Sequence, residues 1–200
     1  MKNVIKHLKK GFLMVTLFAT LLSFATDASS FKIKNEAKRT SLTLYHIKKG
    51  DLLSIKDENG NILYKESMQT TGVYTKGFDL TTLPNGSYMF EVDKDLEINI
   101  IPFTVKHNVV LFDKEKKETI FKPFVRIKGD LIFVSKLSLD KTPLHIDFYR
   151  TDVSNSGHIY SEKIENTKVI ERVYKLRGLD EGHFKIVFHT KGREFTKKIN

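Results

Sequence analysis

The feature that most constrains the fold of this chain is an internal similarity between two segments 96 residues apart. Residues 78–92 (FDLTTLPNGSYMFEV) align without a gap with residues 174–188 (YKLRGLDEGHFKIVF). Seven aligned pairs keep their chemistry: Phe78/Tyr174, Leu80/Leu176, Leu83/Leu179, Gly86/Gly182, Tyr88/Phe184, Phe90/Ile186 and Val92/Phe188. Upstream, residues 60–66 face residues 157–163 with one residue of slippage, as expected at a loop. The pattern predicts two copies of one module.

Within each copy, apolar residues recur at every second position. Tyr88, Phe90 and Val92 alternate with more polar neighbours, and Phe184, Ile186 and Phe188 do the same. The alternation returns at Leu144, Ile146 and Phe148, and at Leu42 and Leu44. A period of two predicts half-buried β-strands. No stretch after residue 28 sustains the apolar spacing of a helix over three turns.

Turn residues separate these strands. Residues 57–60 (DENG), 83–86 (LPNG), 179–182 (LDEG) and 191–192 (KG) place Gly or Asn where a reversal needs a positive φ. We therefore expect Gly86 and Gly182 to adopt a positive φ. Asp57, Asn59 and Asn61 have the spacing that opens a calcium loop, but Ile62 and Met68 stand where that loop needs Gly and Glu. A β-turn is the favoured interpretation there.

About seven short strands in each copy, separated by turns, predict an all-β fold of two tandem antiparallel immunoglobulin-like β-sandwiches. The chain has 200 residues, enough for two small domains. It has no Cys and no Trp, which excludes disulfide scaffolds, zinc ribbons and thiol catalysis. Each core must then consist of Leu, Ile, Val, Phe and Tyr. We expect a short joint near residues 105–110 that limits the swing between the modules.

The N-terminus has the order of a secretory signal peptide. Lys2, Lys6, Lys9 and Lys10 precede an apolar run over residues 11–24, and small residues follow. The run is shorter than the roughly 20 residues that span a bilayer. Cleavage after Ala25 or after Ala28 satisfies the small-residue rule equally well. The predicted organisation is a signal peptide over 1–28, a first module over 29–107 and a second module over 108–200, with no transmembrane segment after cleavage.

Residues 57–64 (DENGNILY), followed by residues 78–92, resemble small sandwich modules of exported bacterial proteins, particularly the C-terminal sorting domain of type IX secretion cargo. Leu80, Leu83, Pro84, Gly86 and Tyr88 match that pattern position by position. The second copy has Asp180 in place of the proline and Phe184 in place of the tyrosine. The resemblance implies a sandwich fold and an exported setting. It implies little about activity, because the matching residues are turn and core residues.

Charge is distributed unevenly along the chain. The formal net charge is +10, and residues 109–200 hold most of the positive excess outside the signal peptide. Such a bias attracts acidic polysaccharide or lipid headgroups, although scattered lysines also serve solubility. No nucleic-acid partner is predicted. The run from Asp113 to Glu118 balances its own charge and is interpreted as a solvated hairpin tip.

Motifs for chemistry are missing from the sequence. There is no His-Glu-x-x-His, no Gly-x-Ser-x-Gly and no phosphate-binding loop. His183 with His189, and His145 with Asp147, share strand faces, but solvent-exposed histidines normally lie at such outward strand positions. We predict no catalytic residue, no cofactor and no metal. Three tyrosines are candidates for a surface that binds sugars or proteins: Tyr45, Tyr149 and Tyr160.

The sequence therefore predicts a secreted or periplasmic, non-enzymatic protein that acts through its surfaces on a protein or glycan of the cell envelope. A sorting or secretion-system accessory module is the first alternative. A hydrolase with a dispersed acid site is the second. The partner, the final compartment and the oligomeric state are left open by the residues alone.

Overall fold

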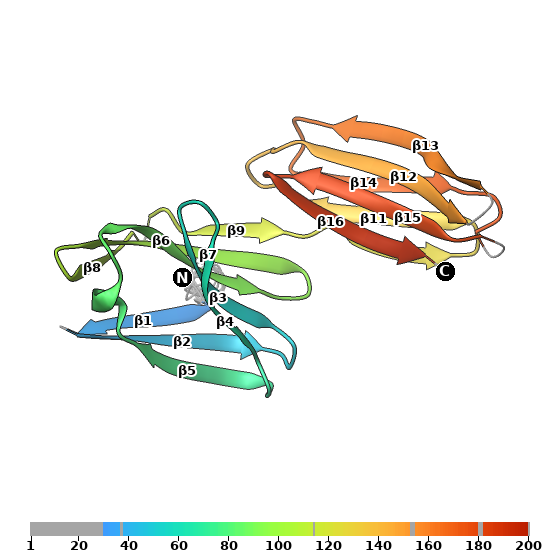
Figure 1. The fold of residues 1–200 in the computed structure, drawn as a ribbon. Helices are drawn as coiled ribbons and strands as arrows, with labels where there is room; N and C mark the ends of the chain where they lie inside the picture. Colours follow the sequence, from blue (N-terminus) through green and yellow to red (C-terminus); the bar gives the residue numbers. More distant parts are fainter. Residues whose placement is uncertain (1–29, 37, 114, 153–154, 180–181, 200) are drawn as a thin grey trace, which may run out of the picture.

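A computed structural model describes residues 30–199, except 37, 114, 153–154 and 180–181. The predicted signal peptide over 1–28 lies outside these residues. The described chain is all-β, with antiparallel strands arranged in two units (Figure 1). The single short 3₁₀ turn among the described residues is η1 (Leu80–Thr82). Over the same residues, no helix has the length and apolarity needed to cross a membrane.

The first module consists of two antiparallel sheets. One sheet has the order β1-β2-β5, from β1 (Phe31–Glu36), β2 (Arg39–Ile47) and β5 (Gly72–Phe78). The other has the order β4-β3-β6-β7-β8, and β9 also pairs with β7. Its strands are β3 (Leu52–Asp57), β4 (Ile62–Ser67), β6 (Gly86–Asp93), β7 (Glu97–Lys106), β8 (Val109–Phe112) and β9 (Glu118–Phe121).

The second module repeats this strand order without the last two strands. Its three-stranded sheet has the order β10-β11-β14, from β10 (Phe124–Lys128), β11 (Leu131–Leu137) and β14 (Val169–Lys175). Its four-stranded sheet has the order β13-β12-β15-β16, from β12 (Leu144–Asp152), β13 (Asn155–Ile164), β15 (Phe184–Thr190) and β16 (Arg193–Ile199). The shared order of three plus four strands is that of an immunoglobulin-like sandwich. The predicted fold class of two tandem sandwiches is confirmed.

Each module has its own hydrophobic core between its two sheets. The alternating residues expected to face inward do so: Phe90 and Val92 are buried in the first core, and Ile186 and Phe188 in the second. Each fully buried large side chain contributes about 1.5–3 kcal/mol relative to exposure. The period of two in the sequence thus decides which face of every strand enters a core.

The joint lies further along the chain than the sequence suggested. The expected boundary between residues 107 and 108 falls between β7 and β8, which pair with each other. β9 also pairs with β7, through Glu97↔Phe121 to Ile100↔Glu118. By strand pairing, residues 109–121 belong to the first module, and the chain passes to the second at residues 122–123. The sequence missed this because the two added strands have no counterpart in the second copy.

The charged run from Asp113 to Glu118 is not the tip of a hairpin. β8 and β9 both run antiparallel to β7 and pair with its two halves, Phe103–Lys106 and Glu97–Ile100. Because β6 occupies the other edge of β7, β8 and β9 follow one another along the same edge. The run therefore connects two strand segments that continue in one direction.

Gly86 and Gly182 lack the positive φ expected of them, although Gly60 (φ 82°) and Gly192 (φ 67°) have it. The aromatic ring two residues later explains why glycine stands there. A Cβ on Gly86 would lie 3.5 Å from the Tyr88 ring, and a Cβ on Gly182 would lie 2.9 Å from the Phe184 ring. In both modules the ring folds back over the glycine, and in the second module it leaves less room for a Cβ at that position.

Tyr88 also closes the turn before its strand. Its hydroxyl donates a hydrogen bond to the carbonyl oxygen of Pro84, four residues earlier, at 2.8 Å. A tyrosine that bonds back to the chain just upstream is the tyrosine corner of immunoglobulin-like sandwiches. Phe184 takes this position in the second module and has no hydroxyl. The pair Pro84 and Tyr88, lost together in the second copy, is thus one structural device.

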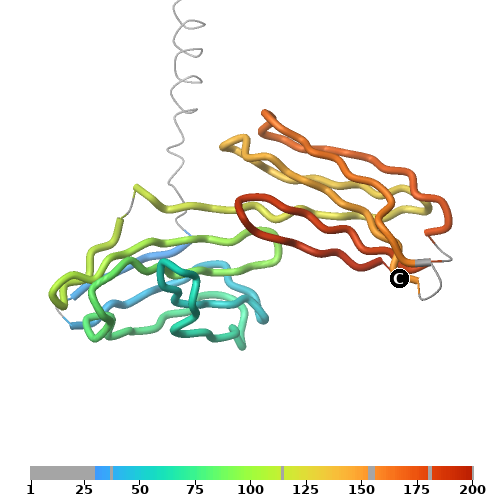
Figure 2. Tube along the Cα trace, turned by 45° about the horizontal axis from the view of Figure 1, so that its top comes forward, coloured from blue at the N-terminus to red at the C-terminus, as the bar shows by residue number. Residues whose placement is uncertain are grey.

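The modules meet through the turn between β15 and β16 (Figure 2). Arg193 Nη2 lies 2.5 Å from Glu91 Oε2 on β6, and Lys56 Nζ lies 2.8 Å from Glu91 Oε1. Lys191 pairs with Glu118 of β9 and, at 2.6 Å, with Asp140. Burial opposes the ionisation of Glu91, but Arg193 and Lys56 outweigh it and keep its pKa below the usual value. These ion pairs hold the second module against the outer face of the first.

Candidate binding surfaces

The three candidate tyrosines do not form one surface. Tyr45 is partly buried on β2 of the first module. Tyr149 lies on the outer face of β12, where His158 meets its ring edge-on and Lys185 Nζ lies 4.9 Å from the ring centre. Tyr160 is opposite Phe148 across β12 and β13 and packs beside Phe148 and Tyr174, on the core side of that sheet. A sugar-binding platform made of all three is therefore not present.

Tyr45 instead lines a groove between the sheets of the first module. The groove has a volume of about 780 Å³ and lies between β1 and β8, the edge strands of the two sheets. Apolar side chains such as Ile33, Val110 and Phe112 form much of its lining. Asn35 crosses one end by donating a hydrogen bond to the carbonyl oxygen of Val110 at 2.8 Å.

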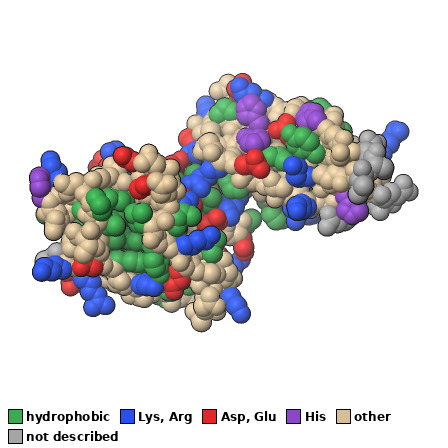
Figure 3. Space-filling view, in the orientation of Figure 1, with side chains coloured by type: hydrophobic (Ala, Val, Ile, Leu, Met, Phe, Trp, Pro, Cys, Tyr) green, Lys and Arg blue, Asp and Glu red, His purple; other side chains and the backbone are tan. Residues whose placement is uncertain are grey.

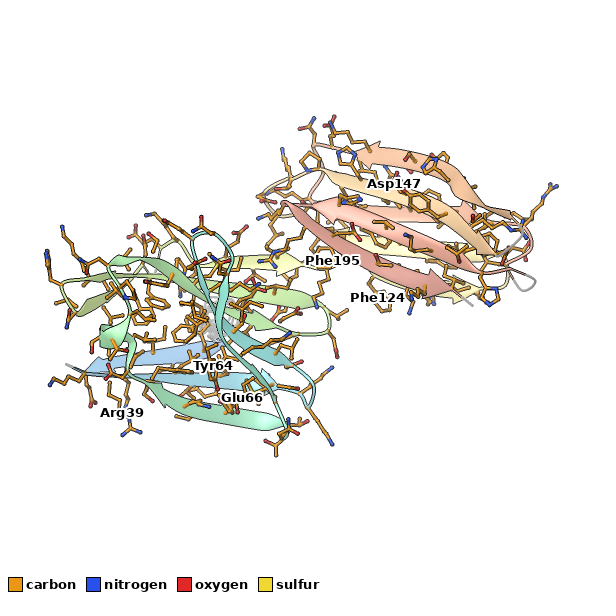
Figure 4. The ribbon with its side chains drawn as sticks, in the orientation of Figure 1. Arg39, Tyr64, Glu66, Phe124, Asp147 and Phe195 are labelled. Atoms are coloured by element: carbon orange, nitrogen blue, oxygen red, sulfur yellow. The ribbon has the colours of Figure 1, made fainter. Side chains whose placement is uncertain are left out.

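Asp147, Ser161 and His158 lie together on the outer face of the β13-β12-β15-β16 sheet (Figure 4). Ser161 donates a hydrogen bond to Asp147, and His158 Nε2 lies 3.0 Å from Ser161 Oγ and 3.5 Å from Asp147 Oδ1. In a catalytic triad the two ring nitrogens of the histidine face the serine and the acid separately. Here the same nitrogen faces both groups, so this is not a relay for nucleophilic attack. No group of three potential ligands suited to a metal ion occurs among the described residues.

A second polar cluster recurs in both modules and closes the side of each sandwich. In the first, Glu66 of β4 accepts hydrogen bonds from Tyr64, from Tyr74 at 2.7 Å and from Lys76 at 2.8 Å. Lys76, Tyr64 and Tyr74 hold the pKa of Glu66 at about 2. Because β4 and β5 belong to different sheets, the cluster joins the two layers.

The counterpart in the second module lies 96 residues later. Glu162 of β13 accepts hydrogen bonds from Arg172 at 2.8 Å and from Tyr174 at 2.6 Å, on β14. Burial opposes ionisation of Glu162, but these two donors outweigh it and keep its pKa below the usual value. The one-residue slippage expected upstream hid this match, because it paired Glu66 with Lys163. The position of these clusters between layers gives them a structural role.

The strongest candidate for binding is the outer side of the β10-β11-β14 sheet, which we call the apolar face. The strand register places its outward residues in rows across the three strands, such as Arg126–Phe133–Val173 and Lys128–Leu131–Lys175. Its six hydrophobic members are Phe124, Leu131, Phe133, Leu137, Val169 and Val173. Val173 is 58% exposed, Val169 is 56% exposed and Phe124, labelled in Figure 4, is 50% exposed.

The corresponding side of the first module is polar. There the outward rows of the β1-β2-β5 sheet include Ser41–Gly77 and Thr43–Thr75, whose hydroxyls lie 3.0 Å apart. Arg39 covers Gly77 so closely that a Cβ on that glycine would lie 2.6 Å from Arg39 Nε. By register, Ser41 and Gly77 stand where Phe133 and Val173 stand in the second module. The same sheet thus presents a solvated surface in one module and a hydrophobic one in the other.

Known proteins give little help in choosing among these surfaces. No protein-family model matches the chain, and no curated protein matches it. Among solved structures, it is similar to a BSP domain of a biofilm-associated protein, with 11% identity, a TM-score of 0.27 and coverage of 84% of this chain and 28% of that one. It is also similar to the human OSCAR ligand-binding domain, with 8% identity, a TM-score of 0.25 and coverage of 84% and 93%.

A further similarity is to the FN1–FN3 domains of chicken CNTN1, with 11% identity, a TM-score of 0.21 and coverage of 84% of this chain and 66% of that one. At TM-scores this low, the superpositions carry no argument about ligand or partner. The assignment of the fold rests on the strand order described above, and the choice of a binding surface rests on the side chains.

Proposed function

We propose that this is an exported, non-catalytic binding protein whose second module binds a protein partner through the apolar face. The observation that supports this is the contrast between equivalent sheets. The packing of the cores does not require Phe133 and Val173 on the outside, because the first module folds in the same strand order with Ser41 and Gly77 there. A contiguous exposed hydrophobic surface on a soluble domain marks an interaction site.

Charge favours an acidic surface on the partner. Three basic residues, Arg126, Lys128 and Lys175, flank the hydrophobic residues. Among the outward residues of the three strands, one is acidic, Glu171. Arg126 lies 4.7 Å from the centre of the Phe133 ring and extends the apolar surface with its own stem. A protein with an apolar patch bordered by Asp and Glu complements this arrangement.

The test compares two lysine substitutions at equivalent places. Val169 and Val73 are both exposed outward residues, 96 positions apart, on the three-stranded sheets of the two modules. Purified full-length chain with V169K or V73K is used beside the unmodified chain to isolate partners from its own cell envelope. Each retained protein is then purified, and its direct binding is measured by calorimetry.

A protein that binds the unmodified chain and V73K equally, and V169K at least about tenfold more weakly, supports the proposal. Equal binding to all three chains overturns it, as does the absence of any direct binder. Sedimentation of the unmodified chain covers the remaining outcome. If the chain forms dimers that V169K dissociates, the apolar face is an interface between copies and the proposal of a different partner is wrong.

A further inference from the structure

The other side of the second module presents positive charge. The outer side of the β13-β12-β15-β16 sheet, which we call the histidine face, faces the viewer in Figure 3 and carries histidine (purple) and basic (blue) side chains. The register places its outward residues in three rows across the four strands. These rows are Lys163–His145–His189–Glu194, Ser161–Asp147–Val187–Thr196 and His158–Tyr149–Lys185–Lys198.

The third row contains positive charge that lacks a counterion. Lys185 and Lys198 are directly opposite one another on β15 and β16. Among the described residues neither lysine has a carboxylate within ion-pair distance; Lys185 Nζ instead lies 4.9 Å from the centre of the Tyr149 ring. Like charges placed directly opposite on neighbouring strands destabilise a sheet. An anion bound across this row would remove the repulsion.

The histidines add charge that depends on pH. His158 and His189 approach Asp147 from either side, with Nε2 at 3.5 Å and 3.9 Å from its two oxygens. His145 is opposite both Lys163 on β13 and His189 on β15, and Glu194 is opposite His189 on β16. Lys163 pairs with Glu165 at 2.5 Å. Imidazoles gain a proton within the range between pH 8 and pH 5. Three imidazoles, whose charge depends on pH, therefore lie on this face beside Lys163, Lys185 and Lys198.

We propose that the histidine face binds an acidic polysaccharide and that this binding strengthens as the pH falls. The chemistry of the face favours a sugar polymer over a lipid surface. None of the twelve residues in the three rows is an exposed large hydrophobic side chain; Val187, in the middle row, is 5% exposed, and the single exposed aliphatic side chain of β13 is Ile159, at the bulge beside His158. A bilayer would require apolar side chains that insert between its headgroups. Spaced cations with the hydroxyls of Ser161 and Thr196 between them suit an extended chain of carboxylates and hydroxyls.

The equivalent face of the first module provides an internal contrast. There Glu91 and Asp93 occupy the positions of Val187 and His189 by register, and the turn of the second module covers Glu91. The first module therefore has no open cationic face of this kind. This proposal is independent of the apolar face, which lies on the opposite sheet, so the failure of one leaves the other standing.

The probe for the test is polygalacturonate, a polymer of uronic acid. Its affinity for the full chain is measured by calorimetry at about pH 5.5 and about pH 7.5. The first variant, K185Q/K198Q, removes the uncompensated pair. The second, H145Q/H189Q, removes two of the three imidazoles. The control, K32Q/K34Q, removes two exposed lysines from β1 of the first module and lowers the net charge by the same amount as K185Q/K198Q. Thermal melts establish that each variant is folded.

We expect the unmodified chain and the control to bind about tenfold more tightly at the lower pH, and binding to weaken as salt is raised from about 0.05 M to about 0.5 M. K185Q/K198Q should bind at least about tenfold more weakly than the control at either pH. H145Q/H189Q should reduce the ratio between the two pH values to about threefold or less.

Three outcomes overturn the proposal. Equal losses in K185Q/K198Q and the control would mean that only total charge matters. A pH ratio unchanged in H145Q/H189Q would remove the histidines from the explanation. Tighter binding to vesicles containing phosphatidylglycerol than to polygalacturonate, measured in parallel, would assign the face to a membrane surface instead.

Discussion

The two modules handle the same exposed strand edge in opposite ways. In the first, β8 and β9 cover the edge of β7, and Ile101 on that strand is buried. In the second, no described strand covers β16, and the residue at the position of Ile101 is Lys197, which is exposed. A lysine on the core side of an edge strand prevents pairing with another chain. One fold therefore tolerates either a covering strand or a charged side chain at this edge.

The comparison extends to the surfaces. The buried positions of the two modules share their hydrophobic character, while the outward positions differ: Ser41 and Gly77 against Phe133 and Val173 on one sheet, and Glu91 against Val187 on the other. Packing constrains the first group in both modules. The second group is free to diverge, and the proposed binding surfaces lie at these divergent positions.

The sharpest way to separate the modules is to damage one core. Phe90 is fully buried in the first module, and Ile186 is its counterpart in the second. F90A should lower the free energy of unfolding of the first module by about 3–5 kcal/mol, and I186A that of the second by about 2–5 kcal/mol, because each leaves a cavity. Hydrogen exchange of β6 and β15 amides monitors the two modules separately. Equal loss of protection in both modules with either variant would show that they unfold as one unit.

Substitutions of the turn glycines should change the free energy of unfolding by less than the core substitutions do. G182A should destabilise the second module by about 1–3 kcal/mol, because the new Cβ would overlap the buried Phe184 ring and has Arg150 at 3.3 Å on another side. G86A should cost less than about 1 kcal/mol, because its Cβ would make an ordinary contact with Tyr88. Urea unfolding of the two variants measures both effects. The interpretation of close ring packing is wrong if G86A proves the more damaging of the two.

The tyrosine corner makes a difference of about 1 kcal/mol. Y88F removes the hydrogen bond to the Pro84 carbonyl oxygen while keeping the ring, and should destabilise the first module by about 0.5–1.5 kcal/mol. The reciprocal F184Y should bring a smaller gain, because the acceptor carbonyl of the first module belongs to Pro84, whose ring fixes φ and preorganises the turn, whereas the second module has Asp180 at that position. Chemical denaturation of both variants checks this. A stabilisation by F184Y as large as the loss in Y88F would show that the proline is not part of the device.

The smallest effect concerns acid stability. The pKa of Glu66 is lowered to about 2, so its ionised form stabilises the native state above the unfolded pKa of about 4.3, and this stabilisation is lost as the pH falls towards about 2. E66Q should therefore make the first module less sensitive to acid over this range. Melting temperatures between about pH 5 and pH 2 measure the slope. E162Q is the matched variant in the second module. If neither substitution changes the dependence of the melting temperature on pH, ionisation of these two glutamates does not contribute to stability.

Much of this architecture follows from the sequence, and the exceptions have identifiable causes. The alternation at Tyr88, Phe90 and Val92 fixed strand, face and core, because a period of two leaves one arrangement that buries every large side chain. The role of Gly86 was not predictable, because its contact with the Tyr88 ring depends on how that side chain folds back. The pairing of β8 and β9 with β7 was not predictable, because an unrepeated strand has no internal match that would show its partner.

The candidate surfaces were harder to predict than the fold. Tyr149 was singled out from the sequence and does lie on an outward face, but Tyr45 and Tyr160 lie elsewhere. Outward strand positions have no sequence signature beyond alternation, and the apolar face combines strands that are up to about 45 residues apart in the chain. Only the register shows that Phe133 and Val173 are neighbours. The contrast with Ser41 and Gly77 required both sheets to be known.

The joint between the modules has a consequence for assembly. The turn of the second module meets two acidic acceptors of the first, Glu91 on β6 and Glu118 on β9, so the contact is heterologous. A contact of this kind, repeated from molecule to molecule, generates rings or open filaments. In the second module Val187 stands at the position of Glu91, and no described strand corresponds to β9, so the described residues there offer neither acceptor to a further turn carrying Lys191 and Arg193.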